Sequence, residues 1–309
     1  MIQASIDLGT NTCLLLVREV SPGSERILHD ESTVVRLGEG VSASGQLLQA
    51  AMERAEACHT SYVGIASQLG VKPHEIVAVG TAQARDAKNA APFFDHLKNL
   101  LGLNFRILSG DEEAKATFLG AKLPLIDASK MVVMDIGGGS TEIVAMPRPD
   151  QGILGESLNI GAVKITERYF HSNPVTDQDF WAAEEAVIRD LSALKTWRKN
   201  LAVAIQGEPR FVAVAGTAVT LAMIQSGLNT FKASEIDGVV ITRGDAHRMV
   251  EELKWRTTEE RKAMPGMEPK RADVILAGAL IFWRVMEELD FHQAIISTRG
   301  LRFGILESL

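Results

Sequence analysis

One segment of this chain combines glycines, hydroxyls and carboxylates in a spacing that suits phosphate chemistry. Residues 131–144 read M-V-V-M-D-I-G-G-G-S-T-E-I-V. An apolar run ends at Asp135, three glycines follow, and a second apolar run begins at Ile143. This pattern predicts a strand, a glycine turn and a returning strand. Because glycine has no Cβ atom, the backbone N–H groups of such a turn can approach an anion closely.

The polar residues of the same segment suit a metal-bound phosphate. Ser140 and Thr141 offer hydroxyl donors, and Asp135 and Glu142 bracket the turn with hard oxygen ligands. Mg²⁺ takes carboxylates of this kind when phosphate oxygens complete its coordination shell. For this segment alone, a plain hairpin with a glycine-rich loop is the alternative interpretation.

A matching segment near the N-terminus favours the phosphate interpretation. Residues 5–17 read S-I-D-L-G-T-N-T-C-L-L-L-V. The aspartate, the first glycine and a small polar residue of the two segments align as Asp7 on Asp135, Gly9 on Gly137 and Thr12 on Ser140. An internal match of this kind predicts a duplicated architecture with two half-sites. We therefore expect two opposed phosphate turns, each with a carboxylate, to form one cleft between two domains.

Two further candidates follow predicted strands. Ligands in open α/β sheets gather at the carboxyl ends of strands. Arg85 comes shortly after a predicted strand at 76–79, and its guanidinium offers a two-pronged donor for phosphate. A solvated helix residue is the alternative for this arginine. Gly216 and Thr217 follow a predicted strand at 211–214 and open an apolar helix, which is typical of an anion-binding corner.

A pair of adjacent glutamates is the candidate for acid–base chemistry. Glu112 and Glu113 follow a predicted strand at 105–108 and begin a predicted helix. Carboxylates in the first turn of a helix stabilise it through the helix dipole, which is a sufficient reason for either one alone. Their position at a strand end, shortly before the Asp135 strand, favours a place beside the cleft.

Length, charge and composition limit the class of protein. A chain of 309 residues can form two domains, and its hydrophobic and charged fractions are those of a soluble globular protein. The net charge of −7 disfavours a nucleic-acid binder, so we expect no specific DNA or RNA partner. No run is long enough to span a membrane, and the first residues lack the basic region of a signal peptide. Cys13 and Cys58 have no metal-type spacing. We expect a cytoplasmic protein.

The elements that must position these residues alternate between strands and helices. Apolar residues three or four apart predict an amphipathic helix over 47–69, and another long helix over 179–200 with Trp181 on its inner face. We expect an α/β protein with a first domain at residues 1–120 and a second at residues 121–296. The last segment, 297–309, is expected to pack back on the first domain.

Several common chemistries have no motif in this chain. The sequence has no G-x-x-x-x-G-K-[ST], no G-x-S-x-G and no H-E-x-x-H. What remains is hard oxygen ligands and backbone anion cradles. These parts suit magnesium-assisted phosphoryl transfer, in which catalysis is mostly positioning and charge neutralisation.

Taken together, six motifs resemble those of the exopolyphosphatase / guanosine pentaphosphate phosphatase (Ppx/GppA) family. They are I-D-L-G-T-N-T, V-M-D-I-G-G-G-S-T-E, S-G-D-E-E-A, S-L-N-I-G-A-V-K-I-T-E-R-Y-F, A-G-T-A-V-T and S-T-R-G-L-R. They cover nearly the whole chain in the family's order. The resemblance implies two actin-like, ribonuclease-H-like domains of duplicated topology with an interdomain cleft. It also implies Mg²⁺-dependent release of terminal phosphate from inorganic polyphosphate or from pppGpp.

The resemblance also implies roles for individual residues. Asp135 and Glu142, with Asp7, resemble the carboxylates of the metal site, and Glu113 matches the glutamate that activates water. An offset of one, to Glu112, stays open. The residues that match phosphate-binding positions are Gly9, Thr10, Asn11, Thr12, Arg85, Gly137, Gly138, Gly139, Ser140, Thr141, Gly216 and Thr217.

The chain departs from the family pattern in two ways, and some alternatives stay open. It resembles a short, two-domain form, whereas longer members carry further C-terminal domains. Phe303 stands where family members often have a glutamate after G-L-R. A kinase of the same fold that uses ATP, or a non-catalytic sensor of (p)ppGpp or polyphosphate, are the rival functions. The sequence does not rank polyphosphate against pppGpp, and it leaves a homodimer open.

Overall fold

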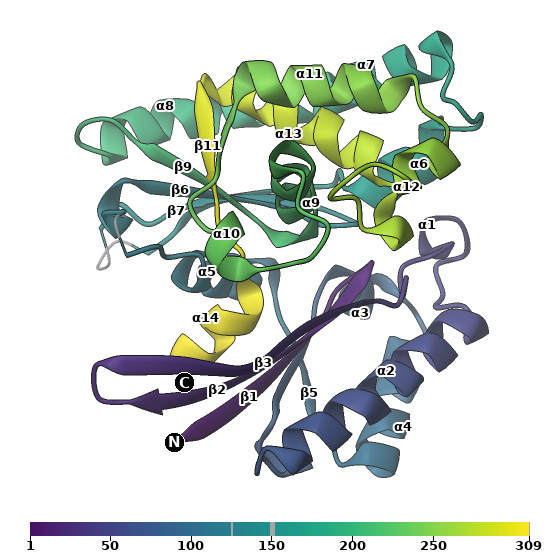
Figure 1. The fold of residues 1–309 in the computed structure, drawn as a ribbon, viewed down its shortest axis with the longest axis vertical. Helices are drawn as coiled ribbons and strands as arrows, with labels where there is room; N and C mark the ends of the chain where they lie inside the picture. The colour runs from purple at the N-terminus through teal and green to yellow at the C-terminus, as the bar shows by residue number, and fades with distance from the viewer. Residues whose placement is uncertain (125, 149–151, 309) are drawn as a thin grey trace. The chain divides into compact units, whose positions relative to one another are not determined.

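The computed structural model describes residues 1–124, 126–148 and 152–308. The chain forms two compact units. Unit 1 contains residues 1–120 and the C-terminal segment that starts at Leu301, and unit 2 contains residues 121–300. Each unit has one mixed β-sheet with helices packed on it (Figure 1).

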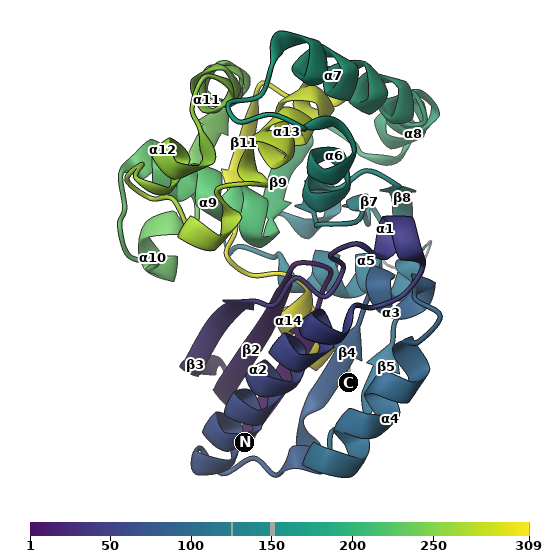
Figure 2. The ribbon, with the colours of Figure 1, turned by 90° about the vertical axis from the view of Figure 1, so that its right-hand side faces the viewer.

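Unit 1 is built on a five-stranded sheet in the order β3-β2-β1-β4-β5. Helices α2 and α4 pack against each other beside this sheet (Figure 2), and α14 packs against α5, β1 and β2. The elements of unit 1 are β1 (Ile2–Leu8), β2 (Thr12–Ser21), β3 (Ser24–Val34), α1 (Val41–Ser44), α2 (Gln49–Gln68), η1 (Pro73–Glu75), β4 (Val77–Gly80), α3 (Ala82–Asp86), α4 (Ala90–Leu101), β5 (Phe105–Ile107), α5 (Gly110–Gly120) and α14 (Leu301–Glu307).

Unit 2 is built on a six-stranded sheet in the order β10-β11-β9-β6-β7-β8. Its central helix, α13, contacts α6, α7, α8, α9 and α11. The elements of unit 2 are η2 (Ala128–Lys130), β6 (Met131–Ile136), β7 (Thr141–Ala145), β8 (Leu154–Leu158), α6 (Ala162–Tyr169), α7 (Asp177–Leu191), α8 (Leu194–Ala204), β9 (Arg210–Val214), α9 (Ala215–Ser226), α10 (Ala233–Ile236), β10 (Val240–Thr242), α11 (Arg243–Lys254), α12 (Thr258–Lys262), η4 (Pro269–Arg271), α13 (Ile275–Leu289) and β11 (Gln293–Ile296).

The two sheets share one topology. In each, three consecutive strands form an antiparallel meander, β1-β2-β3 in unit 1 and β6-β7-β8 in unit 2. Two later strands then add in parallel beside the first strand of the meander, β4 and β5 in unit 1 and β9 and β11 in unit 2. The predicted α/β fold with a duplicated topology is therefore confirmed.

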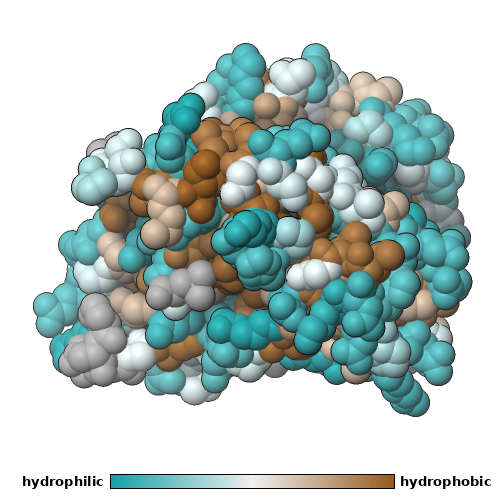
Figure 3. All heavy atoms as spheres, turned by 90° about the horizontal axis from the view of Figure 1, so that it is seen from below, coloured by the Kyte–Doolittle hydropathy of each residue, from teal (hydrophilic) through white to brown (hydrophobic). Residues whose placement is uncertain are grey.

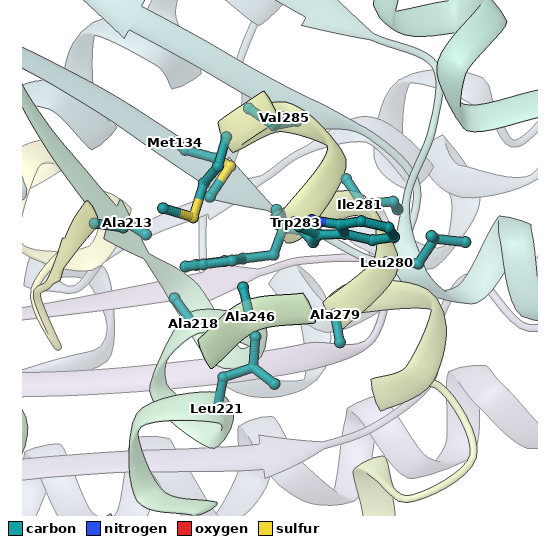
Figure 4. Packing of buried hydrophobic residues seen from close by; sticks show 14 of the residues in the cluster. Met134, Ala213, Ala218, Leu221, Ala246, Ala279, Leu280, Ile281, Trp283 and Val285 are labelled. Carbon is teal, nitrogen blue, oxygen red and sulfur yellow. The ribbon is translucent and has the colours of Figure 1, made fainter. Parts of the chain in front are cut away.

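Strand β6 lies at the centre of the apolar core of unit 2. The side chain of Met134 is fully buried and packs among residues of α9, α11 and α13 (Figure 4). Ala213 of β9 and Leu221 of α9 belong to the same cluster. Residues 131–134 are buried on both faces of the sheet, so a slip of one residue would move the half-buried Asp135 into a fully apolar position. The end of β6, where Asp135 lies, is thus held rigidly.

The long helix expected over 179–200 is in fact two helices, α7 and α8. Ser192 and Ala193 keep helical dihedral angles, but the amide of Ser192 bonds to the carbonyl of Arg189, three residues back. Trp181 was placed on the inner face, and this was wrong: its side chain is 57% exposed, and the neighbouring Phe180 is buried instead. The spacing of apolar residues in a sequence predicts a helix, but it leaves an error of one residue in which side chains face the core.

Three further features concern membrane spans, surface hydropathy and the cysteines. Among the described residues, no helix is both long and apolar enough to cross a membrane. On the face shown in Figure 3, hydrophobic residues lie among hydrophilic ones. Cys13 and Cys58 are both free thiols.

Candidate functional site

The two glycine turns of the sequence have the same backbone geometry. In unit 1 the amide of Gly9 donates to the carbonyl of Thr12 at 2.9 Å, and in unit 2 the amide of Gly137 donates to the carbonyl of Ser140 at 3.0 Å. A Cβ atom at either glycine would lie 3.2–3.3 Å from that same carbonyl oxygen, which is tighter than most real Cβ contacts. Glycine therefore suits both positions for one reason, close approach of the backbone across the turn.

In unit 1 a neighbouring loop holds the carbonyls of the turn. The amide of Gly38 donates to the carbonyl of Thr10 at 2.8 Å, and the amides of Val35 and Arg36 donate to the carbonyl of Asn11 at 3.0 and 2.9 Å. In a trans peptide the C=O and the following N–H point in opposite directions. The amide of Asn11 therefore points away from this loop, as a donor for an anion must.

In unit 2 a helix holds the carbonyls of the turn. The first three amides of α6 donate to the carbonyls of Gly137 and Gly138 at 2.9–3.2 Å. The amides of Gly138 and Gly139 then point away from α6, by the same geometry of the peptide plane. Each unit thus presents turn amides on the side opposite to the element that supports the turn.

In unit 2 two carboxylates face each other across the strands that flank the turn. Asp135 and Glu142 are directly opposite each other in the β6–β7 ladder, so their side chains share one face of the sheet. Glu142 is only 5% exposed, and the hydroxyl of Ser157 donates to it at 3.0 Å. In unit 1 the residue opposite Asp7 is Leu14. The two units therefore share the backbone geometry of the turn, but they differ in the residue opposite its aspartate.

The carboxylate pair of unit 2 fits a hard divalent cation. The described residues contain no cluster of three or more His, Cys, Asp or Glu side chains that would hold a metal alone. Mg²⁺ is ordinarily held by one or two carboxylates, with substrate phosphates and water completing six ligands. Asp135 and Glu142 supply that number of carboxylates next to the turn amides that would hold the phosphate.

Arg85 and Glu113 lie together in unit 1. Arg85 on α3 donates through Nη1 to the carbonyl of Leu108 at 2.6 Å and to Oε2 of Glu113 at 2.8 Å. The Glu113 side chain is 13% exposed, and burial raises the pKa of its carboxyl while the contact with Arg85 lowers it. A raised pKa suits a carboxylate that must accept a proton near neutral pH.

The neighbouring Glu112 has a different task. Its carboxylate accepts a hydrogen bond from the amide of Ser109 at 2.8 Å, and the hydroxyl of Ser109 accepts one from the amide of Glu112 at 3.3 Å. This reciprocal pair is a capping box at the start of α5. The hydrogen bonds to Ser109 lower the pKa of Glu112, which is exposed. Between the two glutamates, the geometry favours Glu113 for chemistry.

Asp7 of β1 is a buried carboxyl that interacts electrostatically with Glu113, the partner of Arg85. Burial and then the negative charge of Glu113 raise its pKa to about 7, and the positive charge of Arg302 lowers it. A carboxyl in this position is costly to ionise until a cation neutralises it. Asp7 and Glu113 therefore form an acidic pair in unit 1, with Arg85 on one member.

Two predicted phosphate ligands have hydroxyls that the fold already uses. Thr141 is fully buried and donates to the carbonyl of Ile160 at 2.8 Å. Thr217 is buried and donates to the carbonyl of Ile136 at 3.3 Å. Both side chains brace the end of the β6–β7 hairpin. Thr141 pairs with Ile136 and with Leu158 in the sheet, so its amide belongs to the ladder, whereas the amide of Thr217 lies in the first turn of α9.

A residue that the sequence reasoning missed lies at the Gly216 corner. A Cβ atom at Gly216 would lie 2.2–2.3 Å from the guanidinium atoms of Arg271, so this half-buried side chain packs directly on the glycine. Burial lowers the pKa of Arg271, and the nearby Glu268 raises it. Ala215, before the glycine, has a φ of 65°, a strained value for a residue with a side chain. The corner combines a helix N-terminus with a guanidinium, and both favour an anion. The sequence signal was a basic pair just before α13.

The end of the chain contributes structure to unit 1. Phe303 is buried with Leu16 and Leu306. Arg302 makes a two-pronged ion pair with Asp30, with both distances at 2.8 Å. This part of the S-T-R-G-L-R motif fastens α14 to the sheet.

A protein-family model and two named proteins match nearly the whole of this chain. Residues 16–309 match the family model described as the Ppx/GppA phosphatase family. The chain is 34% identical to "Exopolyphosphatase 2" of Mycobacterium tuberculosis over 99% of this chain and 98% of that protein. It is 30% identical to "Guanosine-5'-triphosphate,3'-diphosphate pyrophosphatase" of Photobacterium profundum over 99% of this chain and 58% of that protein.

Solved structures give the same result. The crystal structure of the Ppx/GppA family member of Aquifex aeolicus superposes with a TM-score of 0.80 at 29% identity, covering 100% of this chain and 97% of that chain. The two units, with their shared strand order, accordingly have the actin-like fold. The chain belongs to the Ppx/GppA phosphatase family.

Proposed function

We propose that this protein is a phosphohydrolase that releases terminal orthophosphate from inorganic polyphosphate or from pppGpp. The observation that carries the proposal is the half-buried Glu113, which is paired with Arg85 and interacts electrostatically with Asp7 of β1. The names of the relatives in Mycobacterium and Photobacterium, an exopolyphosphatase and a pppGpp pyrophosphatase, support the choice of substrates.

Glu113 is the residue that we propose as general base. Hydrolysis needs a group that accepts a proton from water as the water attacks the terminal phosphorus atom. Glu113 is enclosed enough for its pKa to rise, yet part of its side chain faces solvent. Glu112 holds its carboxylate on the Ser109 amide, where its pKa is lowered and its basicity is weaker.

Arg85 is the residue that we propose to hold the transferred phosphate. Its two hydrogen bonds to Leu108 and Glu113 both use Nη1. Among the residues that the structure describes, Nη2 and Nε have no partner. The guanidinium therefore keeps one edge for phosphoryl oxygens while it fixes the position of the base. Positioning of this kind supplies a large part of the rate enhancement in phosphoryl transfer.

Each glycine turn is proposed to hold oxygens of a phosphate group. Each turn points backbone amides away from its supporting element, at Asn11 in unit 1 and at Gly138 and Gly139 in unit 2. Amides that are fixed before the reaction stabilise developing charge without the cost of reorganisation. We propose Mg²⁺ as the cofactor, held by Asp135 and Glu142, with Asp7 as the third carboxylate named by the family resemblance. A bound Mg²⁺ would neutralise charge on the phosphoryl oxygens.

The decisive experiment is a phosphate-release assay with long polyphosphate, short polyphosphate, pppGpp and ATP, each with and without Mg²⁺. The proposal predicts Mg²⁺-dependent release of orthophosphate from polyphosphate or pppGpp with no acceptor present. A kinase of the same fold would instead need an acceptor and ATP. A non-catalytic sensor would bind the same anions and release no phosphate at any Mg²⁺ concentration.

We also propose a cytoplasmic location, which the sequence led us to expect, and a homodimer, which the sequence leaves open. Fractionation of the source cells tests the first, and recovery of the protein outside the cytoplasmic fraction would refute it. Sedimentation of the purified protein tests the second, and a mass of one chain would refute it.

A further inference from the structure

Gln83 is a buried polar residue that neither the sequence motifs nor the proposed mechanism uses. It lies on α3 between the end of β4 and Arg85, and it is only 4% exposed. Its Oε1 atom is fully enclosed, and no hydrogen-bond partner for it is found in the described part of the chain. Native proteins leave few buried polar atoms unsatisfied, because desolvation without a hydrogen bond is unfavourable. Those that persist often belong to functional sites.

The surroundings of Gln83 connect it to the phosphate turn of unit 1. A Cβ atom on Gly38 would lie 2.3 Å from Cγ2 of Thr10, 2.9 Å from Cγ of Gln83 and 3.0 Å from its Cδ. The side chains of Gln83 and Thr10 therefore cover the same side of Gly38. The amide of Gly38 in turn donates to the carbonyl of Thr10 at 2.8 Å. The carboxamide thus lies against the loop that supports the Gly9–Thr12 turn.

Both side chains keep hydrogen-bonding capacity at this place. Within the residues that the structure describes, neither the Thr10 hydroxyl nor the Nε2 atom of Gln83 makes a hydrogen bond. Nε2 is not enclosed as Oε1 is. A carboxamide with no protein partner can turn its NH₂ end toward an acceptor at little cost, because no existing bond must break first. Phosphoryl oxygens are acceptors of this kind.

We propose that Gln83 is a substrate-binding residue: its Nε2 donates a hydrogen bond to a phosphoryl oxygen held at the Gly9–Thr12 turn, and the Thr10 hydroxyl donates to the same phosphate. This inference rests on the proposed phosphohydrolase function. Neutral donors suit this position because Arg85 already supplies positive charge from the same helix. They add contacts to the anion without a second buried cation, whose desolvation would be unfavourable.

The test combines binding and stability in the full-length protein. Gln83→Met keeps the length of the side chain and removes both polar atoms. We expect its affinity for imidotriphosphate, a non-hydrolysable triphosphate, to fall by roughly tenfold or more in isothermal titration calorimetry with Mg²⁺, because a hydrogen bond to a charged group is lost. The KM for polyphosphate should rise by a similar factor, with kcat little changed. The thermal midpoint should stay the same or rise, because an unsatisfied buried acceptor is gone.

Two further variants complete the design. Gln68→Met, at an exposed position in α2, is the matched control and should leave affinity and KM unchanged. Gln83→Glu keeps the shape and places a carboxylate toward the anion, so its affinity should fall further than that of the methionine variant. If the methionine variant does not fold, the glutamate variant decides the question in the same titration.

The outcomes separate the two proposals. Absence of imidotriphosphate binding by the unaltered protein would overturn the proposed function, and the inference with it. Normal binding by the unaltered protein together with unchanged affinity in Gln83→Met would overturn the inference alone. A large drop in the thermal midpoint with unchanged affinity would show that Gln83 only fills space.

Discussion

The substitution Gly161→Ala would test whether the turn of unit 2 depends on its support by α6. Gly161 is the N-cap of α6, with an ordinary φ of −150°, so alanine causes no backbone strain there. The difficulty is contact: a Cβ atom would lie 2.4 Å from the carbonyl oxygen of Gly138, and the neighbouring backbone atoms at 2.5 and 2.6 Å are as close. Because all three are backbone atoms of the turn, no flexible side chain can move aside.

The size of the effect follows from those distances. Ordinary contact begins at 3.4 Å, so the turn and α6 must separate by about 1 Å. The three hydrogen bonds from the start of α6 to the turn, now 2.9–3.2 Å, would be lost or weakened. At about 0.5–1.5 kcal/mol each, the free energy of unfolding should fall by about 2–4 kcal/mol. A shift of about 1 Å in a group that positions substrate can lower the rate about 10²-fold.

The assay is the initial rate of phosphate release from polyphosphate, measured below the melting temperature of the variant and with its fold checked by circular dichroism. We expect kcat/KM to fall about 10²-fold. The matched control is Gly64→Ala in the exposed part of α2, where a Cβ atom would meet nothing within 4 Å. It should raise stability by about 0.5–1 kcal/mol and leave activity alone. A folded Gly161→Ala protein with the activity of this control would refute the role assigned to the turn.

Three other predictions concern charge. Burial lowers the pKa of His59 from 6.5 to about 4, so the unfolded chain binds a proton more tightly than the folded protein. The contribution of His59 to the free energy of unfolding is therefore fully present above pH 6.5. It falls by about 1.4 kcal/mol per pH unit between pH 6.5 and 4, and levels off about 3 kcal/mol lower. Asp7, whose pKa is raised to about 7, contributes the opposite slope over this range in both proteins. Urea unfolding of the unaltered protein and of His59→Gln should therefore give free energies of unfolding whose difference changes by about 1.4 kcal/mol per pH unit, and parallel pH profiles would contradict it. Glu112→Ala removes the cap on Ser109, so it should lower the thermal midpoint slightly and leave kcat unchanged, whereas a large loss of kcat would make Glu112 the base. Arg85→Lys keeps the charge and loses the two-pronged geometry, so KM for polyphosphate should rise about tenfold; an unchanged KM would remove Arg85 from substrate binding.

The twin turns could be predicted from sequence because their pattern is local. Asp7 aligned with Asp135 and Gly9 with Gly137 in the letters, and the structure repeats even the hydrogen bond that closes each turn. The antiparallel pairing of the first two strands of each sheet followed, because each turn joins them.

What the sequence could not predict depends on contacts between distant segments. The choice between Glu112 and Glu113 depends on which side of α5 packs toward Arg85, a fact of tertiary structure. The role of Arg271 depends on its approach to Gly216, 55 positions away in the chain by their residue numbers. The hydroxyl of Thr141 looked suited to phosphate, yet it bonds to a carbonyl brought near by the fold.

The role of Glu113 as the general base can be measured by comparing binding and turnover in Glu113→Gln. This variant keeps the shape of the side chain and loses its ability to accept a proton. We expect imidotriphosphate to bind to it about as tightly as to the unaltered protein, while kcat for phosphate release falls about 10²–10⁴-fold. Phosphate release at a near-normal rate by the folded variant would contradict the central claim that Glu113 activates the attacking water.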